Sequence, residues 1–308
     1  MANNKKAAKS VLGPALLNAA EKYDNLVLVS ADSGPNSGFS SFIEKYPDRF
    51  YEFGIMEPGV ISAASGMATT GWMPLFCAPA PFVCGRAYEM VRIDCGYMRQ
   101  NVKLIGRNCG FSYNDLGPTH YGLDDIALMR AIPEMVILAP QFADEVVSAF
   151  DAMLAFEGPI YMRVHNAALP EREETKPFVI GKGEVLVEGD AATIISTGNV
   201  TQHALAAAEL LKAEGINVSV IGMPTVYPLD EELILGAAAK GKIFTVEEHF
   251  VDGGLGSAIA SLTAAKQPAQ VIKLGVPNIY CTSGPYDELL HLYGIDAEGI
   301  AKSVKENL

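Results

Sequence analysis

Short apolar runs alternate with helical stretches along nearly the whole chain, and this alternation constrains the fold more than any other feature. In the first half, runs typical of buried strands occur at 25–30, 74–77, 102–106, 135–139 and 159–164. Helical patterns occupy 9–22, 85–98, 123–130 and 141–156. Strands that are joined by helices run parallel, with right-handed crossovers. The sequence therefore predicts an α/β fold with a mostly parallel sheet flanked by helices.

The alternation is interrupted once, by the polar and Pro-bearing stretch AALPEREETKPFVI at 167–180. Such stretches are typical of domain linkers. After it the pattern starts again, with strands expected at 192–196, 217–221, 242–246 and 270–274. We therefore predict two α/β domains in series, with the first at 1–168, a linker at 169–182 and the second at 183–308.

Composition favours a globular enzyme and excludes other classes. Hydrophobic residues make up 49% of the 308 residues and charged residues 19%, which does not suit a disordered chain. The net charge is −13, and the only basic cluster is Lys5, Lys6 and Lys9, so nucleic acid is not an expected partner. We expect no signal peptide and no membrane span, because no apolar core follows the N-terminal MANNKKAAKS and no apolar run approaches the length of a span. We expect no disulfides, because the five cysteines show neither even pairing nor metal spacing. The expected compartment is the cytoplasm.

The segment YEFGIMEPGVISAASGMATTG, at 51–71, predicts a short strand, a turn at Gly54 and a helix that begins near Glu57. Pro58 suits the first helical turn, since its missing N–H would be unpaired there. Free N–H groups and the helix dipole favour a carboxylate at the position of Glu57. On this pattern alone, Glu57 is typical of an ordinary acidic helix start.

Polar residues follow several of the predicted strands. Asp32 and Asn36 follow the first strand, and a Gly-rich loop at 107–122 follows the strand at 102–106. In open α/β sheets, ligands bind at the carboxyl ends of the strands. Asp32 and Asn36 serve equally well as turn residues, and that alternative stays open.

Three segments taken together resemble the transketolase family, which uses thiamine diphosphate. They are GIMEPGVISAASGMA (54–68), the run from RAYEMVR to GPTHYGLDDIALMR (86–130), and VEEHFVDGGLGSAIA (246–260). The resemblance covers essentially the whole chain, in the order of that family's pyrimidine-binding and C-terminal domains. It implies the thiamine diphosphate-binding fold for the first domain.

The resemblance implies roles for residues at the cofactor. Glu57 matches the glutamate that bonds the far ring nitrogen of the aminopyrimidine, and Phe82 aligns with an aromatic residue that packs on that ring. A plain core phenylalanine is an equally good interpretation of Phe82. Pro79 stands where many relatives carry a further aromatic residue. His120, in GPTH, matches a histidine that contacts substrate oxygens.

The resemblance also implies a sugar-phosphate site. Arg163 matches a phosphate-binding arginine, although an ion pair is the alternative, and Lys9 is a weaker match to a second one. Asp32 and Asn36 lie where relatives line the substrate channel. Two positions differ, because Asn108 replaces a usual histidine and Leu116 a usual aspartate. Since those residues normally read sugar hydroxyls, we expect an unusual sugar, branched (an apulose 4-phosphate type) or sulfo-substituted. His165 and His249 receive no role.

The segments that bind Mg²⁺ and the diphosphate in a complete transketolase have no match in this sequence. The resemblance therefore implies a partner subunit that holds Mg²⁺ and shares thiamine diphosphate with this chain, in a heterotetramer of two copies each. Alone, the chain is expected to form an inactive homodimer. The alternatives are a 2-oxoacid dehydrogenase β-like subunit, a 1-deoxyxylulose-5-phosphate-synthase-like subunit and a non-catalytic scaffold.

Overall fold

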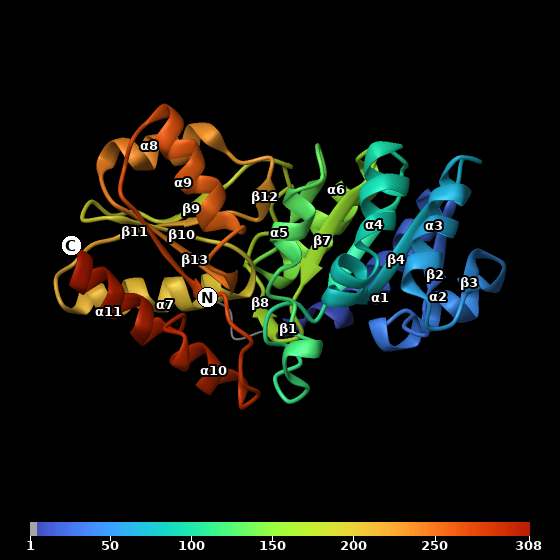
Figure 1. Cartoon of the computed structure of the whole chain (residues 1–308), viewed down its shortest axis with the longest axis horizontal. Coiled ribbons are helices and arrows are strands. Elements are labelled where there is room, and N and C mark those ends of the chain that lie inside the picture. The colour runs from blue at the N-terminus through green and yellow to red at the C-terminus, as the bar shows by residue number, and fades with distance from the viewer. Residues whose placement is uncertain (1–4) are drawn as a thin grey trace.

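The apolar runs of the first half become the inner strands of a parallel sheet (Figure 1). The structure is a computed structural model that describes residues 5–308, so the expected lack of a signal peptide rests partly on residues outside this range. The strands are β1 (Lys5–Ala7), β2 (Leu26–Ser30), β3 (Phe50–Glu52), β4 (Met73–Pro79), β5 (Lys103–Arg107), β6 (Val136–Leu138), β7 (Ile160–Val164) and β8 (Ala168–Pro170). The α-helices are α1 (Ala8–Lys22), α2 (Ser40–Lys45), α3 (Glu57–Ala68), α4 (Tyr88–Met90), α5 (Asp125–Arg130) and α6 (Ala143–Ala155). Short 3-10 turns are η1 (Pro35–Ser37), η2 (Pro47–Arg49) and η5 (Gly117–Thr119).

Alternating side chains of the strands feed two cores. In β4, Leu75 and Cys77 join the core under α1, α2 and α6, whereas Phe76 and Ala78 join the core under α3 and α5. This is the period of two that a strand covered on both faces requires. The result is a sheet with helices on both faces, which confirms the predicted fold class of this domain.

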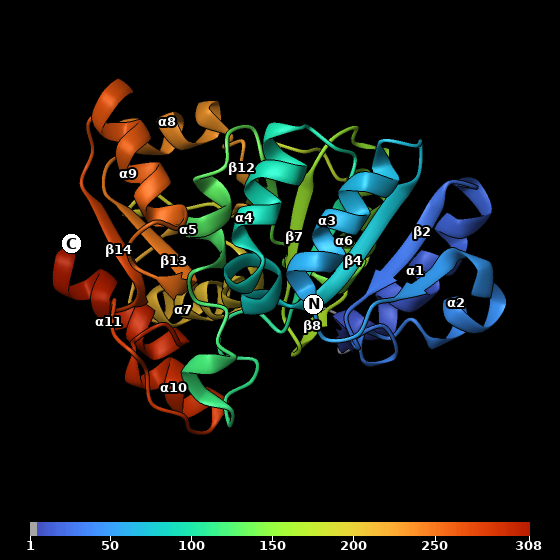
Figure 2. The ribbon, with the colours of Figure 1, turned by 45° about the vertical axis from the view of Figure 1, so that its right-hand side comes forward.

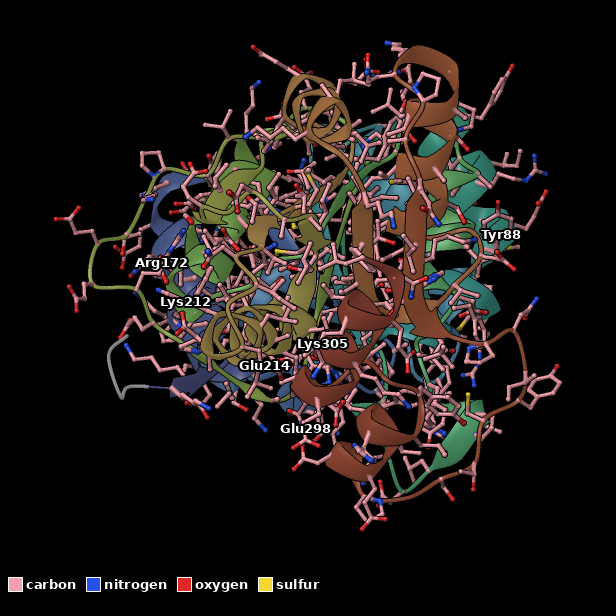
Figure 3. All side chains as sticks on the ribbon, turned by 90° about the vertical axis from the view of Figure 1, so that its left-hand side faces the viewer. Tyr88, Arg172, Lys212, Glu214, Glu298 and Lys305 are labelled. Carbon is pink, nitrogen blue, oxygen red and sulfur yellow. The ribbon has the colours of Figure 1, made fainter. Side chains whose placement is uncertain are left out.

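The second domain repeats the layered plan around a five-stranded sheet. The sheet consists of β9 (Glu184–Val187), β10 (Thr193–Ser196), β11 (Ser219–Gly222), β13 (Ile243–Phe250) and β14 (Val271–Val276), and the domain also contains β12 (Thr225–Tyr227), which pairs outside this sheet. Its helices are α7 (Thr201–Ala213), α8 (Glu231–Lys240), α9 (Leu255–Lys266), α10 (Tyr286–Leu292) and α11 (Ala297–Asn307), with the 3-10 turn η6 (Gly198–Val200). The order is β14-β13-β10-β11-β9, and β9 alone is antiparallel. Helix α11 packs on α7, where Lys305 Nζ lies 2.8 Å from Glu214 Oε1 (Figure 3).

The two domains are joined more closely than the sequence predicts. Strand β12 of the second half pairs antiparallel with β6, so the first sheet has seven strands in the order β12-β6-β7-β5-β4-β2-β3. One hydrophobic core also runs through both domains. Residues 171–183 contain no helix or strand, and we propose that the linker lies there.

The region predicted as one helix at 85–98 is helical, but it is not a continuous α-helix. The structure has two π-helical segments, η3 (Phe82–Arg86) and η4 (Val91–Tyr97), separated by α4. Gly85 and Gly96 lie inside these segments and weaken the preference for a regular α-helix. Segments of π-helix are frequent at functional sites, and η3 contains Phe82.

All five cysteines are buried and free, as predicted. No helix within residues 5–308 combines the length and apolarity that crossing a lipid bilayer requires.

We expect Glu145, on α6, to make stability depend on pH. Burial raises the pKa of its carboxyl from 4.5 to about 7, although the Gln141 N–H bonds one oxygen at 2.6 Å. Because the folded state holds this proton more tightly, the stabilisation is fully present below pH 4.5 and is lost as the pH rises through about 7. The difference between the two pKa values corresponds to about 3 kcal/mol.

Chemical denaturation between pH 5 and pH 8 measures this effect. Wild type should lose about 2.5 kcal/mol more free energy of unfolding over this range than Glu145→Gln, which has no proton to release. Parallel pH curves for the two proteins would contradict the assignment.

Candidate functional site

The local sequence places Glu57 at the base of a cleft. Strand β3 ends at Glu52, and Gly54 turns the chain with φ +74, a value that favours glycine. Helix α3 then begins at Glu57, with Pro58 in its first turn, as predicted. The side chain of Glu57 is only 4% exposed although it lies at a helix start.

One oxygen of this buried carboxylate has no partner. Arg86 Nη1 donates to Glu57 Oε1 at 2.7 Å, whereas Oε2 lacks a hydrogen-bond partner within the described residues. A buried carboxylate oxygen without a donor is costly, and such groups are rare in folded proteins. Glu57 Oε2 therefore indicates a place where a ligand group completes the site.

A first cleft, of about 220 Å³, opens beside Glu57. Phe82 and His120 line it, with their ring centroids 5.2 Å apart in an edge-on arrangement. The guanidinium carbon of Arg86 lies 4.0 Å from the Phe82 ring centroid, so Arg86 covers Phe82 and pairs with Glu57. The remaining lining residues are Ala31, Asp32, Ser33, Ile55, Pro79, Arg107, Tyr113 and Leu116.

A second cleft, of about 240 Å³, lies behind a wall made by Arg107 and Tyr113, which line both clefts. Arg107 is held by hydrogen bonds to Ser37 Oγ, to Asn108 Oδ1 and to the Tyr113 hydroxyl, the last at 2.7 Å. The other lining residues are Ala8, Lys9, Leu12, Asn36, Cys77, Val164, His165 and Asn166. Two cations and no carboxylate line this cleft, which suits an anionic group.

The predicted site residues thus divide between the two clefts. Glu57, Phe82, His120, Asp32 and Leu116 line the first. Lys9, Asn36 and Asn108 line the second. Asp32 and Asn108 both have positive φ, of 56° and 54°. Asn108 directly follows β5, and Asp32 lies two residues after the last residue of β2.

Arg163 is the exception among the predicted residues. Its side chain is 3% exposed, and its Nε donates to Asp125 Oδ2 at 2.9 Å. Its Nη2 donates to the carbonyl oxygens of Gly122 and Glu248. Arg163 lines neither cleft, and this placement does not support the phosphate-binding role that the resemblance implies. The structure instead brings Arg107 to the cleft.

The two histidines without a predicted role lie at the contact between the domains. His249 is fully buried, with Nε2 accepting the Ala127 N–H and Nδ1 facing the Phe250 carbonyl, so both of its ring nitrogens have partners within the protein. His165 lines the second cleft, and its Nδ1 accepts the Ala167 N–H. Its Nε2 lies 3.5 Å from Glu248 Oε1.

Glu248 stays charged although it is buried. Burial alone would raise its pKa, but His165, the Phe111 N–H and the Tyr286 hydroxyl together lower the pKa below its ordinary value.

Sequence reasoning missed Arg86, Arg107 and Tyr113. Arg86 comes four residues after Phe82, a spacing that brings two side chains together on a helix. Arg107 is the last residue of β5, and polar residues at the carboxyl ends of strands are the signal that pointed to Asp32 and Asn36. Tyr113 had no signal, because only the folded loop turns its hydroxyl toward Arg107.

Comparison with known families identifies both halves of the chain. The pyrimidine binding domain of transketolase matches residues 4–172, and the C-terminal domain of transketolase matches residues 181–300.

Several curated relatives match over nearly their full length, and another matches over about half of its length. A putative transketolase C-terminal section from Methanocaldococcus jannaschii is 36% identical, over 98% of this chain and 96% of that protein. One subunit of an apulose-4-phosphate transketolase from Phocaeicola vulgatus is 35% identical, over 99% of both chains. A 6-deoxy-6-sulfo-D-fructose transketolase subunit from a Clostridium species is 33% identical, over 94% and 91%. A 1-deoxy-D-xylulose-5-phosphate synthase from Syntrophotalea carbinolica is 35% identical over 96% of the chain, which spans 47% of that enzyme.

A solved structure has the same fold over the whole chain. It is described as a split gene transketolase in an inactive beta4 tetramer, with a TM-score of 0.89 and 33% identity. The alignment covers 98% of each chain.

Proposed function

The chain belongs to the transketolase family, and from this premise we propose that it is the C-terminal subunit of a split, thiamine diphosphate-dependent transketolase. The reaction moves a two-carbon ketol unit from a ketose phosphate to an aldose phosphate. The partner subunit holds Mg²⁺ and the diphosphate. The names of relatives as a transketolase subunit, a C-terminal section and a split-gene product support this division.

The observation that carries the proposal is the unpartnered Glu57 Oε2 in a cleft beside Phe82. A protonated ring nitrogen of the aminopyrimidine would donate to this oxygen, and Phe82 would offer an apolar face for the ring, so the residues present fit this half of the cofactor. Arg86 occupies Oε1 and leaves Oε2 as the atom that would share a proton with the ring. When bound, thiamine diphosphate supplies the carbon that takes up and releases the ketol unit.

His120 acts at the substrate end of the first cleft. Its Nδ1 lies 2.9 Å from the Thr119 hydroxyl, which leaves Nε2 to bond or exchange a proton with a substrate oxygen. Phe82 and Tyr113 hold the ring edge-on at 5.2 and 5.5 Å. These contacts restrict the orientation of the imidazole.

The second cleft receives the phosphate of the sugar. Lys9 and Arg107 supply positive charge there, and Asn36 and Asn108 supply amide groups. Arg107 is already oriented by three hydrogen bonds, so little of its side-chain entropy remains to be lost on binding.

Lys9→Met is expected to raise KM for a ketose phosphate about 10-fold and to leave kcat within about twofold, because one charge-assisted contact is lost in bound substrate and transition state alike. KM for the same ketose without its phosphate should not change. Steady-state kinetics of the two-subunit enzyme measure KM for the two ketoses. The control variant is Lys45→Met, because Lys45 pairs with Glu21 and lines neither cleft. An equal rise in KM for both ketoses would show that Lys9 does not contact the phosphate.

The sugar itself is proposed to be branched or substituted. Leu116 lines the first cleft with 49% of the residue exposed, where relatives carry a carboxylate that accepts a sugar hydroxyl. An apolar group there leaves a hydroxyl unpaired and favours a bulkier or differently placed group. The sugars named for two of the relatives, apulose 4-phosphate and 6-deoxy-6-sulfo-D-fructose, are of these kinds.

The test is a turnover screen on the assembled two-subunit enzyme. Ketol transfer from xylulose 5-phosphate is compared with transfer from branched and sulfonated ketoses, and pyruvate is offered separately. Pyruvate decarboxylation would favour a 2-oxoacid dehydrogenase or a 1-deoxyxylulose-5-phosphate synthase. If xylulose and ribose phosphates are the best pair by a wide margin, the sugar proposal is wrong while the transketolase proposal stands.

The proposed assembly contains two copies each of this chain and its partner. Alone, we propose that the chain forms an inactive homodimer through α3. A tetramer like the one described for the solved relative is the other arrangement that sedimentation of the isolated chain would reveal.

A further inference from the structure

The segment that carries His120 leaves its own domain and lies against the second one. We refer to residues 111–121 as the His120 loop. Its base is closed by two reciprocal hydrogen bonds between Gly110 and Gly122, at 2.9 and 3.0 Å. Figure 2 shows the loop in green, reaching down beside α10 of the second domain. The part of the second domain that it meets is residues 276–295, which we call the C-terminal arm.

Polar contacts tie the His120 loop to the C-terminal arm at two points. Asn114 Nδ2 donates to the Gly284 carbonyl at 2.8 Å, and the Gly284 N–H donates back to the Asn114 carbonyl at 3.1 Å. The Tyr121 hydroxyl lies 2.9 Å from the Asn114 carbonyl and 3.0 Å from the Thr282 carbonyl. Tyr121, which directly follows His120, therefore joins Asn114 of the loop to Thr282 of the arm.

Apolar contacts join the same two segments. Phe111 stacks on Tyr293 with ring centroids 5.5 Å apart and an angle of 10°, and it meets Tyr121 edge-on at 4.9 Å. The buried cluster comprises Phe111, Tyr121, Leu123, Val276, Cys281, Leu289, Leu290 and Ile295. Five of these residues belong to the arm, so the loop has its hydrophobic core in the second domain.

The base of the loop rests on Glu248 as well. The Phe111 N–H donates to Glu248 Oε1 at 2.5 Å, and a Cβ at Gly110 would lie 2.2 Å from the same oxygen. Only glycine allows this approach, and φ of +60 at Gly110 favours glycine too.

The ring contacts and the side-chain hydrogen bond of His120 found within residues 5–308 are with first-domain side chains. Its ring meets Phe82 and Tyr113, which line the cleft, and its Nδ1 meets Thr119. The imidazole thus faces the cleft while the backbone beside it is held from the other domain. Small displacements of a substrate-contacting group lower rates strongly, so this backbone support matters for catalysis.

We propose that Tyr121 is a positioning residue for His120, and that the C-terminal arm sets where the His120 loop lies over the substrate. The second domain thereby contributes to the reaction without touching the substrate. The catalytic part of this inference rests on the proposed function, whereas the holding of the loop does not.

The first test needs no activity. Hydrogen exchange of the full chain is followed by mass spectrometry for wild type and Tyr121→Phe. We expect exchange within 112–120 to rise about five- to tenfold and exchange in β4 and β5 to stay unchanged. Tyr51→Phe is the control and should match wild type. It loses a hydroxyl that donates to the Asp48 carbonyl, and neither residue belongs to the His120 loop or the C-terminal arm. Unchanged exchange in the loop of both Tyr121→Phe and Asn114→Ala would overturn the proposal.

The second test asks whether Tyr121 acts through His120. In the assembled enzyme, Tyr121→Phe should lower kcat/KM for a ketose phosphate about 10-fold with unchanged affinity for thiamine diphosphate, because the Glu57 end of the cleft is untouched. In a His120→Ala background the same substitution should have no further effect. An equal loss in both backgrounds, or no loss in wild type, would overturn it. If wild type transfers no ketol unit at all, the proposed function fails, and the exchange result alone decides whether the arm holds the loop.

Discussion

Glu57→Gln is expected to lower kcat of the assembled enzyme about 1000-fold, the size typical of losing a group that moves a proton in catalysis. Glutamine keeps the shape of the side chain and its reach toward Arg86, but its amide cannot take up or return a proton at the position of Oε2. The effect should appear mainly in kcat, because Phe82 and the partner subunit still bind the cofactor. Glu57→Asp, which withdraws the carboxylate by one methylene, should retain more activity than Glu57→Gln.

Steady-state kinetics with saturating thiamine diphosphate measure this effect, with Glu89→Gln as the matched control. Glu89 is an exposed carboxylate that pairs with Arg92 and lines neither cleft, so its removal should leave kcat unchanged. Thermal unfolding of each variant separates loss of chemistry from loss of fold. Full turnover by Glu57→Gln would favour the scaffold interpretation of this chain over the enzymatic one.

The fold could be predicted where each strand carries its own signal. Strands such as β2 can be predicted because a strand that is buried on both faces needs a continuous apolar run. Helices such as α3 can be predicted where the sequence marks the first turn clearly. The antiparallel β9 and β12 were missed. Residues 225–227 are too short to show a period, and what makes them a strand is the free edge of β6 in the other domain. Pairing over such a separation is a tertiary effect that no local pattern contains.

The site could be predicted where a residue's role depends on its own element. Glu57, Phe82 and His120 meet in one cleft because each comes from a segment that ends at the same edge of the sheet. Arg163 shows where such reasoning fails. Its position at the end of β7 is correct, but Asp125, 38 residues earlier in the chain, takes the guanidinium into the interior. The sequence shows the strand end and does not show the ion pair.

Arg86 illustrates the same limit from the other side. Arg86 lies over the Phe82 ring and pairs with Glu57 from a π-helical turn that begins at Phe82, whereas the predicted helix begins only at residue 85. The four-residue spacing of Phe82 and Arg86 is visible in the sequence, but the π-helical turn and the ion pair with Glu57 are not. Regular patterns predict the scaffold of this site, and its irregular parts complete it.

The chain alone is expected to show no measurable ketol transfer, and addition of its partner to raise the rate by at least about 1000-fold, since binding and orientation of the cofactor need both chains. Large apolar side chains are exposed on and around α3: Ile55, which lines the Glu57 cleft, is 73% exposed, and Tyr97, at the end of η4 packed on α3, is 83% exposed. This is the surface we expect the partner to cover. A Cβ at Gly66 on α3 would meet no atom within 4 Å, so Gly66→Arg should fold normally and block that contact.

Sedimentation and activity against partner concentration measure this prediction. Gly66→Arg should weaken assembly at least about 100-fold and lose activity in proportion, because a long charged side chain must be buried or displaced at the contact. Gly236→Arg on α8 is the matched control, since a Cβ there also meets no atom within 4 Å and lies in the second domain. Robust turnover by the chain alone would refute the split enzyme. Normal assembly of Gly66→Arg would instead move the contact away from α3.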